Sequence, residues 1–215
     1  MSVELKNRII TSFFLVILLF LIFSYKLVLV YSLIILSVLS ILEFLAMSSR
    51  IISKKIYLLA ANFTFIIYVY VFCLFFFYFS NFYHLQKILL IFLFGCIASD
   101  IGGFIFGKLI KGPKLTKISP KKTIAGSIGS IFLTVLVMTC LMLFFTNSFK
   151  SAFFLLALVT SVGCQIGDLF FSYLKRKAKL KDTGKFLPGH GGVLDRLDGI
   201  FFGLPIGLLY LVLFY

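Results

Sequence analysis

Apolar residues fill long stretches of this 215-residue chain, and short polar segments separate the stretches. A helix that crosses a membrane needs about 20 mostly apolar residues. Because the stretches are continuous and do not alternate with polar residues, they favour helices over the strands of a membrane barrel. The pattern predicts seven transmembrane helices, at about residues 9–24, 27–47, 56–80, 86–107, 123–146, 152–174 and 198–215.

The composition agrees with a membrane protein. Hydrophobic residues make up 61% of the chain, the mean hydropathy is +1.14 and there are 29 Phe residues. These values exclude an ordinary soluble domain of this length. The four cysteines fall within the predicted helices without metal-ligand spacing, so we interpret them as small buried apolar residues. We predict an all-α, polytopic integral membrane protein that forms one membrane-embedded domain over residues 1–215.

The positive charges predict the orientation of the chain. If the N-terminus lies in the cytoplasm, 18 of the 21 Lys and Arg residues lie on the cytoplasmic side, and Lys26, Lys87 and Lys150 lie outside. The positive-inside rule favours this arrangement. We therefore expect a multi-pass membrane protein with a cytoplasmic N-terminus. As its location we take the bacterial cytoplasmic (inner) membrane, which the charges alone do not determine. Attraction to anionic lipids is an alternative role for the basic loops, above all for residues 108–122.

Acidic residues are few, and most of them lie near the predicted cytoplasmic ends of helices. These five are Glu43, Asp100, Asp168, Asp195 and Asp198. Carboxylates within membrane segments are costly and usually face a polar interior. Their similar depth predicts a shared pocket open to the cytoplasm. Separate pairing of each carboxylate with a lysine is the alternative interpretation.

Two polar segments, residues 172–198 and 108–123, carry the groups that phosphate chemistry needs. Carboxylates suit Mg²⁺, a hard cation that usually binds one or two of them together with substrate phosphates. Lys and Arg side chains stabilise negatively charged oxygens, and glycines such as Gly191 and Gly192 allow backbone N–H groups to approach a phosphate. Thr123 is a candidate cap for the helix that follows it. These parts predict Mg²⁺-dependent phosphoryl or nucleotidyl transfer.

The segment from Ser172 to Asp198, SYLKRKAKLKDTGKFLPGHGGVLDRLD, resembles the signature of the phosphatidate cytidylyltransferase (CDP-diacylglycerol synthase) family. Three other segments are also similar to that family: residues 5–11, residues 100–129 and the GDLF sequence at 167–170. The resemblance covers most of the chain and is strongest in its C-terminal half. The chain departs from the family pattern at Phe171, Ala125 and Gly199, and these departures concern the fit of lipid or nucleotide.

The resemblance implies that the chain transfers the cytidylyl group of CTP to phosphatidic acid, giving CDP-diacylglycerol and pyrophosphate in phospholipid biosynthesis. A phosphate oxygen of the lipid would attack the α-phosphorus of CTP at the cytoplasmic face. The resemblance also implies Asp168 and Asp195 as ligands of Mg²⁺, Asp198 as a third ligand, and K⁺ as a second cation. CTP, phosphatidic acid and the lipid bilayer are the implied partners, together with a second copy in a homodimer, and we expect no nucleic-acid partner.

The resemblance gives roles to further residues. It implies catalytic roles for Asp168, Asp195, Asp198, Arg196 and His190. It implies substrate binding by Lys175, Arg176, Lys181, Asp182, Ser119, Lys121, Lys122, Gly191, Gly192 and Asp100. Lys175 or Arg176 could instead anchor the end of its helix, and Asp182 could be a local partner of Lys181.

His190 has two interpretations of equal weight. It could contact phosphate or protonate the leaving pyrophosphate, or it could fix the turn at residues 188–192 by hydrogen bonding.

Two other functions remain open from the sequence. One is a different CTP-dependent enzyme of lipid metabolism, a polyprenol or isoprenoid-lipid cytidylyltransferase or kinase, which would differ in the acceptor or in the transferred group. The other is a membrane transporter, which could also use carboxylates within the membrane. Transporters often contain inverted repeats and broken helices at the membrane midplane, and neither is evident in this sequence.

Overall fold

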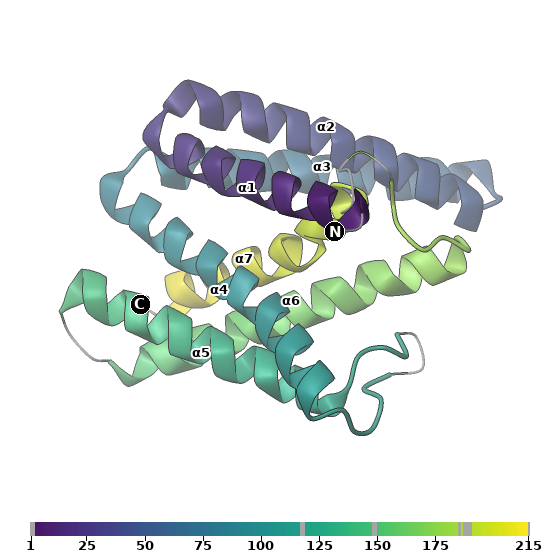
Figure 1. Ribbon diagram of the computed structural model, residues 1–215. Coiled ribbons are helices and arrows are strands. Elements are labelled where there is room, and N and C mark those ends of the chain that lie inside the picture. Colours follow the sequence, from purple (N-terminus) through teal and green to yellow (C-terminus); the bar gives the residue numbers. More distant parts are fainter. Residues whose placement is uncertain (1–2, 117–118, 148–149, 185, 187–190, 215) are drawn as a thin grey trace. The chain divides into compact units, whose positions relative to one another are not determined.

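The computed structural model describes residues 3–116, 119–147, 150–184, 186 and 191–214, with side chains from residue 13 onwards (Figure 1). Within these residues the chain forms seven helices: α1 (Val3–Ser24), α2 (Lys26–Ile51), α3 (Lys55–Ser80), α4 (Tyr83–Leu109), α5 (Ile124–Thr146), α6 (Ser151–Lys177) and α7 (Leu194–Phe214). The described residues contain no strand; Lys114 and Thr123 form an isolated antiparallel bridge, and Gly191 is a further isolated bridge residue. The predicted all-α fold is therefore confirmed.

The helices match the predicted stretches and extend beyond several of them. In the described part of the chain, α2 to α7 are each long and apolar enough to cross a membrane, whereas the apolar part of α1, Phe13–Ser24, is shorter. The largest extension is at α1, which begins at Val3 instead of residue 9. Such extensions arise because backbone hydrogen bonding can continue through polar residues after the apolar stretch has ended. The cytoplasmic N-terminus stays a prediction.

The chain divides into two compact units, and both α6 and α7 contribute to each of them. Unit 1 contains Met1–Phe82 and Leu174–Leu197, and unit 2 contains Tyr83–Tyr173 and Asp198–Tyr215. The acidic and basic candidates are distributed over both units.

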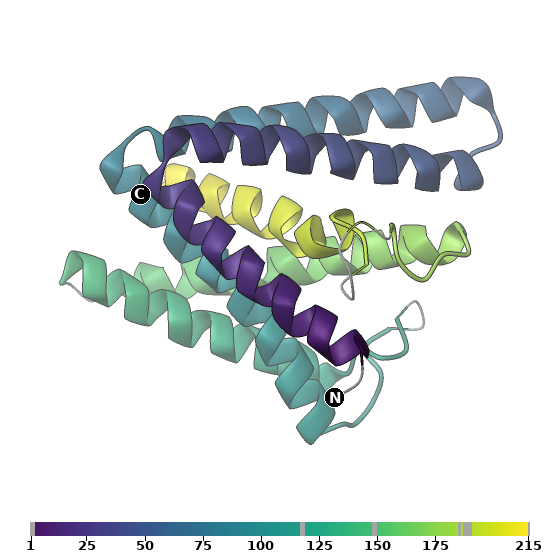
Figure 2. The ribbon, with the colours of Figure 1, turned by 45° about the horizontal axis from the view of Figure 1, so that its top comes forward.

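Unit 1 is built on an antiparallel hairpin of α2 and α3, from which α1 diverges at Tyr25 (Figure 2). The rings of Phe44 and Phe65 stack between the two hairpin helices with their centroids 3.9 Å apart. The Ser48 hydroxyl donates a hydrogen bond of 2.7 Å to the side-chain oxygen of Asn62. The buried face of α2 that makes these contacts also carries Glu43.

Unit 2 packs its helices through small residues. At Gly102 on α4, an added Cβ would collide with the backbone carbonyl of Gly129 on α5. At Gly163 on α6, an added Cβ would lie 3.0 Å from the Cα of Gly203 on α7. Small residues allow helix backbones to approach closely inside a membrane. The four helices of this unit therefore have contact faces that leave little room for larger side chains.

Polar side chains also connect the helices of unit 2. The Ser130 hydroxyl on α5 donates a 2.7 Å hydrogen bond to the backbone carbonyl of Ser99 on α4. Gln165 on α6 donates from its amide nitrogen to the carbonyl of Ser127 at 3.2 Å and accepts from the hydroxyl of the same serine. These bonds fix α6 against the first turns of α5, one helical turn before Asp168.

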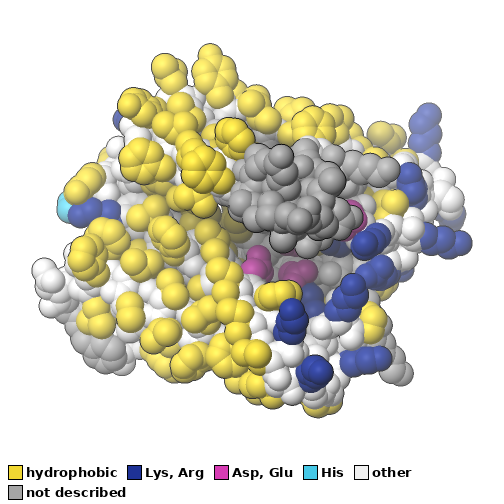
Figure 3. Space-filling model, viewed as in Figure 1, with side chains coloured by type: hydrophobic (Ala, Val, Ile, Leu, Met, Phe, Trp, Pro, Cys, Tyr) yellow, Lys and Arg dark blue, Asp and Glu magenta, His cyan; other side chains and the backbone are white. Residues whose placement is uncertain are grey.

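Large apolar side chains cover much of the surface, as the yellow areas of Figure 3 show. The helix α3 is the extreme case, because only 11% of its most apolar stretch is buried inside the protein. Exposed apolar side chains of this extent are unfavourable in water and favourable in hydrocarbon. The surface is thus that of a protein whose helices contact lipid.

Candidate active site

In unit 1 the helix α6 ends in a sharp turn that starts the loop connecting it to α7. Lys179 has a φ of 57°, in the left-handed region. The N–H of Leu180 donates to the carbonyl of Lys175 at 2.8 Å, and the N–H of Lys179 donates to that of Arg176 at 3.1 Å. This pair of bonds is a Schellman ending. It terminates α6, and we call the described residues of 178–193, namely 178–184, 186 and 191–193, the connecting loop.

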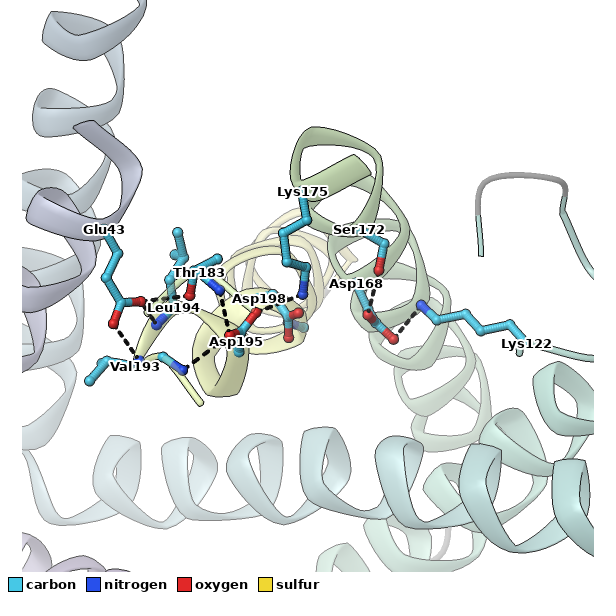
Figure 4. Close-up of polar contacts among 12 residues, drawn as sticks. Glu43, Lys122, Asp168, Ser172, Lys175, Thr183, Val193, Leu194, Asp195 and Asp198 are labelled. Atoms are coloured by element: carbon cyan, nitrogen blue, oxygen red, sulfur yellow. Dashed lines mark hydrogen bonds and ion pairs between the residues drawn. The ribbon is translucent and has the colours of Figure 1, made fainter. Parts of the chain in front are cut away.

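Asp195, in the first turn of α7, binds groups on both sides of the connecting loop (Figure 4). One carboxylate oxygen pairs with Nζ of Lys175 at 2.7 Å, and the side chains of this pair are 7% and 12% exposed, respectively. The other oxygen accepts the N–H of Thr183 at 2.8 Å and the N–H of Gly192 at 3.1 Å. Asp195 therefore connects the end of α6, the connecting loop and the start of α7.

Glu43 holds the same loop from α2. It is 8% exposed and accepts three hydrogen bonds (Figure 4). The donors are the hydroxyl of Thr183 at 2.7 Å and the backbone N–H groups of Val193 at 3.0 Å and Leu194 at 2.9 Å. The first N–H groups of a helix have no partner within it, so Glu43 satisfies two donors at the start of α7.

Two glycines of the connecting loop are required by its geometry. Gly191 has a backbone φ of 86°, which residues other than glycine rarely adopt. Gly192 lies so close to Thr183 and Glu43 that an added Cβ would collide with both side chains. Both residues were predicted to bind substrate phosphate. The contacts described here give them a role in the shape of the loop, and phosphate binding stays a prediction.

In unit 2 the predicted polar loop forms a small hairpin before α5. The N–H of Leu115 donates to the carbonyl of Lys122 at 2.8 Å, and that of Ile124 donates to the carbonyl of Pro113 at 3.1 Å. Pro120 occupies the second position of a tight turn that is closed by a 3.0 Å hydrogen bond from the N–H of Lys122 to the carbonyl of Ser119. Proline is favoured there because its φ is already fixed.

Thr123 caps the first turn of α5, as the sequence predicted. Its hydroxyl oxygen accepts the N–H of Gly126 at 3.1 Å, and its own backbone is extended. The cap and the hairpin together fix the start of α5 and the position of Lys122, the residue directly before Thr123.

Asp168 pairs with Lys122 within unit 2 (Figure 4). Its other carboxylate oxygen accepts a 3.4 Å hydrogen bond from Ser172, one turn further along α6. The side chains of Asp168 and Lys122 are 33% and 26% exposed, so the pair is accessible from outside the unit. The structure therefore brings together one candidate metal ligand and one candidate phosphate-binding lysine.

Asp198 is buried on α7. One of its carboxylate oxygens accepts the N–H of Gly199 at 2.9 Å. It lies three residues after Asp195, and residues three apart lie on the same side of a helix.

The remaining candidates differ in exposure. Ser119 and Lys175 are half-buried or more, whereas the other described candidates, namely Arg176, Arg196, Lys121, Lys181, Asp182 and Asp100, are exposed. His190 lies outside the described residues, as does Gly189. The roles predicted for all of these residues stay predictions, and so does a single pocket for the five carboxylates.

Thr183 had no predicted site role, and the partners of Glu43 were not predicted from the sequence. Glu43 is 140 positions before Thr183, and no local pattern connects two residues at that separation. A usable signal was present at Glu43 itself, because an acidic residue inside an apolar helix needs buried donors.

The carboxylates differ in how well they suit a metal ion. Asp168 is the more exposed, whereas Asp195 already accepts three hydrogen bonds and its side chain is 7% exposed. No group of three or more Asp, Glu, His or Cys side chains suited to a metal occurs among the described residues. Mg²⁺ often takes one or two carboxylates and completes its shell with waters and substrate phosphates. The carboxylate oxygens of Asp168 fit that mode of binding. The predicted set of three ligands, Asp168, Asp195 and Asp198, stays a prediction.

Two departures from the expected family pattern have a structural account. Phe171 is 1% exposed and packs against Phe201 and Phe202 of α7, with ring centroids 6.5 and 6.2 Å away. It therefore belongs to the apolar core of unit 2. At Gly199 an added Cβ would lie 3.6 Å or more from its nearest neighbours, so there is room for the Cβ that a serine would bring.

Comparison with known proteins gives a family match along almost the whole chain. Residues 7–214 match the sequence model described as "Cytidylyltransferase family". A protein named "Phosphatidate cytidylyltransferase" from Helicobacter pylori (strain ATCC 700392 / 26695) is 46% identical over 119 residues, which are 55% of this chain and 44% of that protein.

Proteins of the same name from two staphylococci are also similar. The one from Staphylococcus haemolyticus (strain JCSC1435) is 46% identical over 112 residues, and the one from Staphylococcus aureus (strain COL) is 43% identical over 111 residues. Each match covers 50% of this chain and 42% of the relative. The matched stretches thus span less than half the length of these curated relatives.

Proposed function

The chain belongs to the cytidylyltransferase family, and we propose that it transfers the cytidylyl group of CTP to phosphatidic acid. The products are CDP-diacylglycerol and pyrophosphate. The observation that carries this proposal is the family match over residues 7–214. The names of the relatives from Helicobacter pylori and the staphylococci support phosphatidic acid as the acceptor.

The reaction is a substitution at the α-phosphorus of CTP. A non-bridging oxygen of the lipid phosphate forms a new bond to this phosphorus. The bond from the α-phosphorus to the oxygen that bridges to the β-phosphate breaks, and pyrophosphate leaves with the electron pair. The attacking oxygen is already negatively charged near neutral pH, so no strong base is needed. The main barrier is repulsion between two anions, which nearby cations reduce.

The basic residues of both polar segments supply such cations. We assign the phosphates of CTP and lipid to the following residues: Lys175, Arg176, Lys181, Arg196, Ser119, Lys121, Lys122, Gly191 and Gly192. Asp100 and Asp182 complete the polar surroundings. Arginine forms two parallel hydrogen bonds to phosphate, and lysine acts as a compact charge. Lys122 and Lys175 are each held by a carboxylate, which keeps their charges in fixed places.

We propose Asp168, Asp195 and Asp198 as the residues that hold Mg²⁺. When bound, this ion neutralises phosphate charge and polarises the reacting phosphoryl group. Asp168 is suited to this role by its partly exposed carboxylate and by the adjacent Ser172 hydroxyl. Asp195 keeps one acceptor position beyond its three described hydrogen bonds, since a carboxylate has about four. A role for K⁺ as a second cation is part of the same proposal.

We place the protein in the cytoplasmic membrane of a bacterium, with the reaction on the cytoplasmic side, where CTP is available. The concentration of Lys and Arg in residues 108–122 and 175–196 supports this orientation. We also propose that two copies of the chain form a homodimer, and this part of the proposal rests only on the family resemblance.

The test uses the full chain purified in detergent, with phosphatidic acid, labelled CTP and Mg²⁺, and follows CDP-diacylglycerol by chromatography. We expect product with the unmutated protein and at least a 100-fold lower rate with Asp168→Asn at an unchanged melting temperature. Product at an unchanged rate in Asp168→Asn would keep the reaction and reject the role of Asp168. Reaction with polyprenyl phosphate but not with phosphatidic acid would change the acceptor. Absence of product with every lipid phosphate would contradict the proposed function.

A further inference from the structure

Glu43 lies far from the signature segment in sequence and contacts it at three points. It comes from α2, the second helix of the chain, whereas its donors are Thr183 in the connecting loop and Val193 and Leu194 at the start of α7. All three donors described for it are neutral groups. Glu43 as a whole is 8% exposed. A buried charge is tolerated when hydrogen bonds compensate its lost hydration, and the three short bonds at Glu43 do so.

The location of two of these donors makes the contact favourable in a second way. Val193 and Leu194 supply N–H groups at the start of α7, where the aligned peptide dipoles place partial positive charge. An acidic group usually reaches this position from the first turn of the same helix. Here the carboxylate comes from a different helix, so it fixes the start of α7 relative to α2 within unit 1.

The close approach of Glu43 also accounts for two glycines of the signature segment. An added Cβ at Gly184 would collide with one Glu43 oxygen, and an added Cβ at Gly192 would collide with the other. Glycine is thus required at both positions if the carboxylate is to reach the loop backbone. At Gly184 the three nearest atoms all belong to Glu43, whereas at Gly192 the added Cβ would also collide with Thr183 and with the backbone of Gly184.

Thr183 connects Glu43 to Asp195. Its hydroxyl donates to Glu43, and its backbone N–H donates to Asp195. Asp195 also follows directly after Leu194, whose N–H is bound by Glu43. The carboxylate of Asp195 is therefore oriented by two residues that Glu43 holds.

We propose that Glu43 is a positioning residue for the reaction, acting through Thr183 and the start of α7 on Asp195. This inference rests on the proposed function, because it assumes that Asp195 acts on the substrates or their metal ion. Loss of the Glu43 contacts leaves Asp195 with its own bonds to Lys175, Thr183 and Gly192 and removes the hydrogen bonds by which Glu43 holds Thr183 and the start of α7 in place.

The test compares four variants with the unmutated full chain in detergent. Glu43→Gln keeps the size of the side chain and replaces one acceptor oxygen by an NH₂ group, which cannot accept a bond from an N–H donor. Thr183→Val removes the hydroxyl at nearly constant volume, and Thr183→Ser retains it. Ser49→Ala is the control, since Ser49 is exposed on the same helix and bonds within it.

Two quantities are measured. The first is the hydrogen exchange of peptides that contain Thr183 and residues 191–195, together with the melting temperature. The second is steady-state kinetics with CTP and phosphatidic acid. We expect Glu43→Gln to speed exchange of these amides about 10-fold and to lower kcat at least 10-fold, with KM for CTP changed less than about 3-fold, because one lost buried bond has that order of effect. Thr183→Val should behave similarly, and Thr183→Ser and Ser49→Ala should resemble the unmutated protein.

Three results would overturn the inference. Unchanged exchange in Glu43→Gln would mean that Glu43 does not hold the loop. Faster exchange with unchanged kcat would mean that the contact serves stability alone. Equal kinetics of Thr183→Val and Thr183→Ser would exclude the hydroxyl as the connection, and this pair decides the matter if Glu43→Gln does not fold. Failure of the proposed function is distinct from all three, because it appears as absence of product with the unmutated protein.

Discussion

At the scale of single residues, the two candidate carboxylates Asp168 and Asp195 share one feature. Each forms an ion pair with a lysine of its own unit, Lys122 and Lys175, respectively. The two pairs differ in exposure, since the side chains of the first are about one-third and one-quarter exposed, whereas those of the second are nearly buried. Exposed pairs contribute little to stability, and removal of one partner from a buried pair is costly.

This difference predicts that Lys175→Met destabilises the protein by about 2–4 kcal/mol, because it leaves the buried charge of Asp195 without its cation. The measurement is thermal unfolding in detergent. Lys177→Met, at an exposed lysine two residues away, should change stability by less than about 0.5 kcal/mol. Equal melting temperatures for the two variants would show that the Lys175–Asp195 pair does not contribute to the stability of the protein.

The sequence was informative about which residues carry charge at the site and uninformative about their partners. The acidic residues near helix ends were identified as unusual because a carboxylate in an apolar helix is costly. The partners depend on the three-dimensional path of the chain. Thr183 and Lys122 reach Glu43 and Asp168 across 140 and 46 positions, and no spacing rule predicts such pairs.

At the scale of elements, the ends of the helices position the site. The start of α5 is fixed by the Thr123 cap and by the hairpin before it, and Lys122 is the hairpin residue directly before Thr123. The cap was predictable from the sequence because threonine before an apolar stretch is a common helix start. The hairpin was not predicted, since its two bonds join residues whose side chains give no periodic signal.

Removal of the cap should destabilise the start of α5. We expect Thr123→Val to lower the free energy of unfolding by about 1 kcal/mol, because the N–H of Gly126 loses its acceptor. Thr123→Ser keeps the hydroxyl and should differ from the unmutated protein by a few tenths of a kcal/mol at most. Thermal unfolding of both variants in detergent provides the comparison. A valine variant as stable as the serine variant would exclude the cap.

Helix contacts in unit 2 lead to a second prediction at this scale. Gly102→Ala places a methyl group against the backbone of α5, which cannot move as a side chain can, so we expect a loss of about 1–3 kcal/mol. Gly199→Ala has room for its methyl group and gains helix propensity, so we expect unchanged or slightly raised stability. Melting temperatures in the reverse order would contradict the packing described for α4 and α5.

At the scale of the whole molecule, the all-α fold and the number of helices followed from hydrophobic stretches, because a bilayer requires them to be long and continuous. The observed helix ends differ from the predicted ones by several residues. The bilayer requires a certain length of apolar residues and does not determine where the hydrogen bonding of the helix stops. The orientation in the membrane rests on the distribution of Lys and Arg residues alone.

The orientation is testable by labelling of single introduced cysteines in right-side-out membrane vesicles. We expect a membrane-impermeant thiol reagent to label Lys150→Cys, in the loop between α5 and α6, and not Lys114→Cys, in the loop before α5. The unmutated protein is the control, because its four cysteines lie within the helices α3 to α6. Labelling of Lys114→Cys alone would reverse the predicted topology.

The most direct test of the account asks which phosphorus atom of CTP reaches the lipid. The purified chain receives phosphatidic acid, Mg²⁺ and CTP labelled at either the α- or the γ-phosphate. Cytidylyl transfer predicts that the α-label enters the lipid product and that the γ-label leaves in pyrophosphate. Entry of the γ-label into the lipid would identify a kinase and contradict cytidylyl transfer as the reaction of this chain.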